Sequence, residues 1–167
     1  MIGAHPGILA ELAALTRDRD WLVAQRALDL LEKVAQEQPR LVAPYKRVFL
    51  GPLAGSDKWE IRLQIVRALP LFDWTPRQLG RVEHILTENI SFRQTFVQAW
   101  ALDGLARIAE RRTRLRPLVL RHLRKFERSS SKALQARARQ IRNRLKARPP
   151  TGSPMEPRIR RRSVARE

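Results

Sequence analysis

The chain has 167 residues, of which 34 are Lys or Arg and 16 are Asp or Glu, so its formal net charge is +18, and it contains no cysteine. Its length suffices for one packed domain or a few stacked repeats, and its 43% hydrophobic content argues against a disordered protein. The absence of cysteine excludes a disulfide framework and thiolate metal sites.

The start of the sequence indicates neither a secretion signal nor a membrane anchor. It lacks a basic leading segment, and Glu11 interrupts its apolar stretch. No run along the chain approaches the roughly 18 apolar residues that a membrane-spanning helix needs. We therefore predict a cytoplasmic protein that does not contact a membrane.

Apolar periodicity predicts eight helices along the chain. They are expected at residues 6–15, 20–36, 44–53, 58–71, 76–89, 92–110, 115–127 and 131–147. Every second helix repeats one apolar template with spacing i, i+4, i+7, i+8 and i+11, which is one face of a helix. The template starts at Val23, Ile61, Val97 and Leu134. The repeating unit is therefore a pair of helices in about 37 residues.

This repeat predicts the fold class. No stretch alternates with the period of two that a strand requires, so the fold is expected to be all-α. One helix pair cannot bury its apolar stripe, whereas stacked pairs can. We predict an α-solenoid, or superhelix, of about four helix pairs that spans residues 1–147. Residues 148–167 are Pro-rich and then basic, and they are predicted to form a disordered tail.

Helix ends are indicated by local signals. Asp57 lies three residues before Glu60, as in a capping box, and Thr75 precedes a proline in the position of an N-cap. Ser91 is expected to cap the helix that follows it. Pro70 is expected to end or kink the fourth predicted helix, because proline has no backbone N–H to donate.

The fourth repeat differs from the others at two core-facing positions. Where the earlier units have Leu or Val, it has Arg139, and where they have Leu, it has Arg142. One interpretation is a terminal cap whose outer side meets water, as the end of a stack requires. The other is that these arginines dock a partner. The two interpretations are compatible.

Three stretches resemble the helix pattern D-x-W-x-V-R-x-x-A-x-x-A-L of the HEAT-repeat superfamily, particularly its short bacterial type. They are residues 20–23, 57–62 and 97–109, and the resemblance covers about residues 5–147. It implies a curved helical stack that contacts proteins or nucleic acids. It does not name a partner, because fold does not fix function.

A narrower branch, the HEAT-type alkylpurine DNA glycosylases, resembles the chain in fold and charge. That resemblance implies aromatic residues and a catalytic aspartate in a basic concave face. The residues that could be nominated are Trp21, Trp59, Trp74, Trp100, Asp57 and Asp103. Trp21 and Trp59 occupy equivalent positions near helix starts, which favours packing over catalysis.

No pattern of an enzyme is present in the sequence. The glycines are dispersed and form no phosphate-binding loop. His84 is followed four residues later by Glu88 rather than by a second histidine, so there is no zinc-binding helix. We predict no catalytic residue, no cofactor and no metal site.

The charge is concentrated in the last third of the chain. Residues 1–110 hold 14 basic and 13 acidic residues, whereas residues 111–167 hold 20 basic and 3 acidic residues. Such asymmetry suggests an anionic partner. Rows of Arg and Lys beside an apolar stripe suit the binding of phosphate or carboxylate groups. The candidate residues are Arg114, Arg121, Arg124, Lys125, Arg128, Lys132, Arg137, Arg139, Arg142 and Lys146.

These observations predict a non-catalytic HEAT-repeat scaffold or adaptor for protein–protein interaction, with an acidic protein surface as the expected partner. The alternative is a nucleic-acid-binding HEAT-repeat protein of a DNA-repair-like kind, whose affinity would fall steeply with salt. A solvated basic face without a ligand also fits the composition. A further alternative is a subunit whose exposed apolar repeat edge joins a larger assembly.

Overall fold

The computed structural model describes residues 6–147, and all regular elements in that range are helical. This confirms the all-α class for the described part of the chain, and the predicted tail at 148–167 lies outside it. The α-helices are α1 (Pro6–Leu15), α2 (Trp21–Glu37), α3 (Pro39–Val42), α4 (Trp59–Ala68), α5 (Pro76–Ile90), α6 (Thr95–Arg111), α7 (Arg116–Glu127) and α8 (Lys132–Ala147). Short 3₁₀ segments lie between them: η1 (Ala43–Leu50), η2 (Pro52–Gly55), η3 (Leu69–Leu71) and η4 (Thr113–Leu115).

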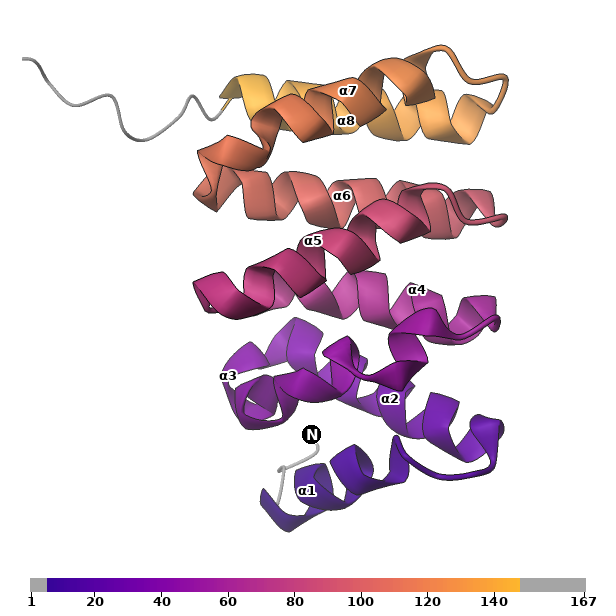
Figure 1. Cartoon of the computed structure of the whole chain (residues 1–167), viewed down its shortest axis with the longest axis vertical. Coiled ribbons are helices and arrows are strands. Elements are labelled where there is room, and N and C mark those ends of the chain that lie inside the picture. Colours follow the sequence, from indigo (N-terminus) through magenta and orange to yellow (C-terminus); the bar gives the residue numbers. More distant parts are fainter. Residues whose placement is uncertain (1–5, 148–167) are drawn as a thin grey trace, which may run out of the picture.

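The helices follow one another along the long axis of the molecule (Figure 1). Each of α2, α4, α6 and α8 packs against the next, so these four helices form one layer. The helices α1, α5 and α7 pack against α2, α6 and α8, and η1 lies between α1 and α5, both of which it contacts. Segments one repeat apart in the sequence therefore lie side by side.

The repeated apolar template forms much of the core. In the two middle repeats, which begin at Ile61 and Val97, all five template positions are buried. In α2, however, Val23 and Leu30 are exposed. The prediction that they belong to the core is wrong, because α2 is the first helix of its layer and nothing among the described residues packs against that side.

The predicted helix at 44–53 is the least regular part of the stack. The structure has 3₁₀ segments there, interrupted at Gly51, whose N–H donates to the carbonyl oxygen of Val48 at 3.3 Å. Pro44 and Pro52 each remove a backbone donor from this stretch, which favours short segments over a continuous α-helix. Pro70 acts as predicted: α4 ends at Ala68, and a 3₁₀ turn follows.

Two of the predicted caps are wrong. The N-cap of α4 is Lys58, without a side-chain hydrogen bond, so Asp57 and Glu60 form no capping box. Ser91 is the C-cap of α5, and α6 starts four residues later. Thr75 forms the complete capping box of α5 with Gln78: each side chain accepts a hydrogen bond from the other residue's backbone N–H.

This difference between the predicted caps can be measured. The substitution Thr75→Ala should lower the free energy of unfolding by about 1 kcal/mol, because it leaves the N–H of Gln78 without its side-chain acceptor. Ser91→Ala should change it by less than about 0.5 kcal/mol. Urea titration of both variants beside the parent protein tests the assignment. An equal loss in the two variants would contradict it.

Candidate anion-binding surface

The outer face of α7 carries four of the predicted residues: Arg121, Arg124, Lys125 and Arg128. Their side chains are exposed and lie on one side of the helix, since residues three, four and seven apart share a helical face. The opposite side consists of the buried residues Val119, His122, Leu123 and Phe126. Among the described residues, none of the four cations has an ion-pair partner.

A second row of cations lies along α8. Lys132, Arg139 and Lys146 are exposed and recur every seven residues, so their backbones stand about 10.5 Å apart along the helix axis. They too have no ion-pair partner among residues 6–147. These three residues and the four on α7 are called the basic surface below.

The other three predicted residues have acidic partners. Arg114 forms an ion pair with Glu83 of α5. Arg142 donates two hydrogen bonds to the carboxylate of Glu127, at 2.6 and 2.9 Å. These hydrogen bonds are the main reason that the pKa of Glu127 lies below its ordinary value. Because such pairs compensate the positive charge, Arg114 and Arg142 contribute less to an attraction for outside anions than the sequence indicates.

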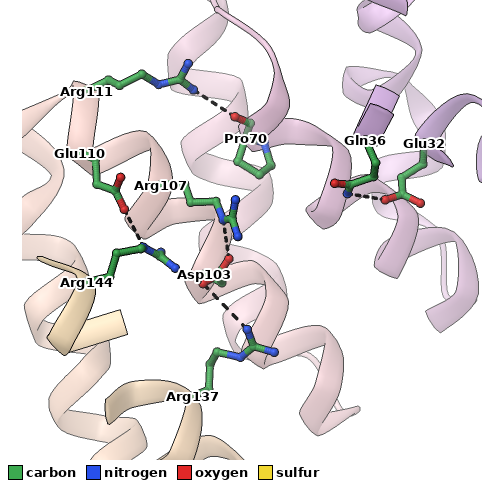
Figure 2. A network of polar contacts seen from close by, with 9 residues as sticks. All are labelled: Glu32, Gln36, Pro70, Asp103, Arg107, Glu110, Arg111, Arg137 and Arg144. Atoms are coloured by element: carbon green, nitrogen blue, oxygen red, sulfur yellow. Dashed lines mark hydrogen bonds and ion pairs between the residues drawn. The ribbon is translucent and has the colours of Figure 1, made fainter. Parts of the chain in front are cut away.

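Arg137 is the third paired residue, and it belongs to a network around Asp103 (Figure 2). The carboxylate of Asp103 is buried and accepts hydrogen bonds from Arg107 at 2.7 Å and from Arg144 at 2.8 Å, while Arg137 lies 4.0 Å away. Arg144 also donates to Glu110 at 2.7 Å. Of these contacts only the one between Asp103 and Arg107, which are four residues apart, joins residues of a single helix turn.

The network holds the last helix pair to the stack. Burial alone would raise the pKa of Asp103, but the hydrogen bonds from Arg144 and Arg107 outweigh it and hold the pKa below its ordinary value. The carboxylate is therefore ionised at neutral pH and bridges α6 to α8. The side of α8 that carries Arg137 and Arg144 thus contacts the neighbouring helix, whereas Lys132, Arg139 and Lys146 have no ion-pair partner among the described residues.

A groove between α7 and α8 lies beside the basic surface. It has a volume of about 160 Å³ and is lined by Arg116, Leu120, Arg142, Leu145 and Lys146. Leu120 is 38% exposed there. This groove could not be predicted from the sequence, because it depends on how the two helices pack. The groove combines apolar side chains with positive charge. A binding site for an amphipathic acidic segment requires both.

His122 lies on the inner side of α7, beneath the cations. It is buried, and burial lowers its pKa below the ordinary value, as do the charges of Lys125 and Arg121. The imidazole is therefore neutral at pH 7. Its pKa depends on the charge of the surface above it.

The residues nominated from the DNA-glycosylase resemblance are dispersed. Trp74 is buried and donates to the carbonyl oxygen of Leu69 at 2.7 Å. Trp59 packs edge-on against Phe96 and stays 36% exposed, and Trp21 lies under the ammonium group of Lys58.

The remaining nominated residues have other contacts. Trp100 lies between the guanidinium groups of Arg67 and Arg137, at 5.3 and 4.8 Å. Asp57 offers its backbone oxygen to Arg93 at 3.0 Å, and Asp103 is occupied by the arginines described above.

Comparison of the chain with protein-family models, with curated proteins and with solved structures found no match. Within residues 6–147, no three His, Asp or Glu side chains are grouped so that they could hold a metal ion. In the same range, no helix has the length and apolar character needed to cross a membrane. The fold and the surface thus define an all-helical protein with a strongly basic last helix pair.

Proposed function

We propose that the chain is a non-catalytic, HEAT-like α-solenoid scaffold whose last helix pair captures an acidic segment of a partner protein. The main support is the charge of that pair: residues 112–147 contain 13 Lys or Arg and one acidic residue, Glu127. The acids that neighbouring helices bring to this region, Glu83, Asp103 and Glu110, already pair with arginines. The seven cations of the basic surface therefore remain available to an outside anion.

The solenoid part of the proposal is supported by the regular packing of α2, α4, α6 and α8, each against the next. It is also supported by the resemblance of residues 5–147 to HEAT repeats. In a stack of repeats each unit contacts only its neighbours, so one side of the last unit stays open to a partner. Arg139 and Arg142 occupy positions of that unit that are apolar and buried in the earlier ones.

An acidic protein segment fits the surface better than a nucleic acid does, because of the groove between α7 and α8. A peptide can place an apolar side chain on Leu120 and Leu145 while its carboxylates meet Lys146 and the neighbouring cations. A phosphodiester backbone has no apolar group for this position. Phe126, the aromatic residue nearest in sequence to these cations, is buried and cannot stack on a base.

Fluorescence anisotropy tests the proposal with two labelled probes: a peptide that alternates glutamate and leucine, and a DNA duplex. Both are titrated at roughly 50 and 200 mM salt. We expect the peptide to bind the parent protein. A variant with all four cations of the α7 face changed to Glu should bind it about 30-fold more weakly or worse, because four attractions become repulsions.

A matched control has the same number of reversals elsewhere, at Arg17, Arg19, Arg40 and Arg47, which are exposed in the first half of the stack. It has the same net charge as the α7 variant but should keep the peptide affinity. Equal losses in the two variants would overturn the proposal in favour of unspecific attraction. Leu120→Ser should weaken peptide binding several-fold and leave duplex binding unchanged. Preference for the duplex, with a steep salt dependence, would favour the nucleic-acid alternative.

His122 provides an independent readout in the parent protein. An acidic peptide over Arg121 and Lys125 cancels part of the field that lowers the pKa of His122. The pKa of this imidazole should therefore rise toward its ordinary value when the peptide saturates the protein. NMR titration of the histidine ring signals with and without peptide measures this change. An unchanged pKa would place the peptide elsewhere.

A further inference from the structure

The N-terminal end of the stack presents apolar side chains to solvent. Two residues of α1 and two of α2 contribute: Ile8 is 44% exposed, Leu15 41%, Val23 36% and Leu30 42%. In each helix the two residues are seven apart, so they lie on the same side of that helix. Together they form what we call the apolar end.

The repeat explains what this side of each helix does elsewhere. In the later repeats, the positions equivalent to Val23 and Leu30 are buried. Those equivalent to Val23 are Ile61, Val97 and Leu134, and those equivalent to Leu30 are Ala68, Gly104 and Ile141. The position of Gly104 faces the preceding helix of the layer, since a Cβ there would lie 3.1 Å from the carbonyl oxygen of Val66. The equivalent residues of α2 therefore face the place where a preceding helix pair would pack.

The residues of α1 follow the same rule. In α5 and α7 the residues equivalent to Ile8 are Val82 and Val119, and those equivalent to Leu15 are Asn89 and Phe126; all four are buried. The irregular second unit differs, since its equivalents are the half-buried Tyr45 and the exposed Pro52. The apolar end thus corresponds to a surface that the third and fourth repeats bury. Its exposure leaves four apolar side chains on one face without a partner among the described residues.

The opposite end of the stack cannot cover this face. There, Arg139 and Arg142 replace the apolar residues with which an earlier repeat meets the next one. Arg139 is exposed, and Arg142 is held by Glu127. Packing that end on the apolar end would bury charges against hydrocarbon, which is costly. Head-to-tail growth into a filament is therefore disfavoured.

The charges beside the apolar end match a second copy of the same end. Glu11 lies between Ile8 and Leu15 on α1, and Arg26 lies between Val23 and Leu30 on α2, with the same i, i+3, i+7 spacing. Both charged side chains are exposed. When α1 of one copy packs antiparallel on α2 of the other, the apolar residues of the two helices therefore meet. The same packing brings Glu11 of one copy next to Arg26 of the other.

We propose that two copies of the chain associate through their apolar ends about a two-fold axis, with α1 of each copy on α2 of its partner. A two-fold interface uses the same patch twice, so each copy contributes one Glu11–Arg26 pair. The dimer places the two basic surfaces at its far ends. This inference rests on the repeat packing and is independent of the ligand that the basic surface binds.

Light scattering coupled to size-exclusion chromatography tests the dimer with the full chain at tens of micromolar. We expect twice the mass of the chain. The variant Val23→Glu with Leu30→Glu should be monomeric, because dimerisation would bury two charges per copy and become about 100-fold weaker or more. Leu41→Glu, a similar change at an exposed leucine outside the apolar end, should stay dimeric. Circular dichroism confirms that each variant is folded.

Charge exchange makes the test specific for the proposed geometry. Glu11→Arg or Arg26→Glu alone should weaken the dimer, and the double variant should restore it, because the pair is re-formed with reversed signs. A monomeric parent protein, an oligomer larger than two, or a double variant weaker than both single ones would overturn the proposal. None of these outcomes bears on the binding of an acidic peptide at the other end.

Discussion

The substitution Gly104→Leu is expected to lower the free energy of unfolding by about 3 kcal/mol, although leucine is the better helix former. Gly104 lies where α6 crosses α4. A Cβ at this position would lie 3.1 Å from the carbonyl oxygen of Val66 and 3.2 Å from a methyl group of Leu86. The carbonyl belongs to the backbone of α4 and cannot turn away. Any larger side chain must therefore push the two helices apart, which opens the core.

Gly80 provides a matched control, because it is also inside a helix but is exposed, and no atom beyond the nearby backbone of its own helix lies within 4 Å of the position of a Cβ. Gly80→Leu should raise the free energy of unfolding by about 0.5–1 kcal/mol through helix propensity alone. Denaturant titration of both variants gives opposite signs if close helix contact determines the result. A stabilised Gly104→Leu protein would mean that α4 and α6 are less tightly packed than the structure has them.

One position of the repeat, occupied by Leu30 in α2 and by Gly104 in α6, shows how far the sequence predicts this fold. The helices follow from periodicity, because each must bury one stripe, and seven of the eight predicted helices are present with ends shifted by a few residues. The template did not distinguish exposed Leu30 from buried Ala68 and Gly104. Burial at this position depends on whether a helix pair precedes the unit, which a local pattern does not contain.

The same reasoning applies to the candidate site. The exposure of Arg121, Arg124, Lys125 and Arg128 follows from their place opposite the apolar stripe of α7. The pairing of other arginines did not follow, because their acids lie far along the chain: Arg144 and Asp103 are 41 residues apart. Such a pair becomes visible only when the packing of α8 against α6 is known.

A substitution in the network around Asp103 is expected to have the second large effect on stability. Asp103→Asn should lower the free energy of unfolding by about 2–3 kcal/mol at pH 7, because it leaves Arg144, Arg107 and Arg137 without the carboxylate that compensates them. The expected loss is smaller than for a fully buried ion pair, because the side chains of Arg137 and Arg144 are about 30% exposed and water partly screens their charges. Because the contacts join α6 to α8, hydrogen exchange should quicken most in α7 and α8.

The pH dependence follows from the lowered pKa of Asp103. A carboxyl group with a lower pKa in the folded state stabilises the protein fully above its unfolded pKa, near 3.8, and loses this effect as the pH falls through the folded pKa. The difference between the parent protein and Asp103→Asn should therefore be constant between about pH 5 and 8. It should shrink below about pH 4. Urea titrations at three or four pH values measure it.

Asp29→Asn is the matched control for this prediction, because Asp29 is the equivalent residue of the first repeat. Its partners are the exposed Lys33 at 2.7 Å and the amide of Gln64 at 2.9 Å, so its charge compensates one solvated ammonium group rather than three arginines. The same substitution there should cost less than about 1 kcal/mol. Equal losses at the two positions would mean that the arginines of α8 do not depend on Asp103. The last helix pair would then be held mainly by its buried apolar residues, among them Leu134, Ala138 and Ile141, and by the ion pair between Arg144 and Glu110.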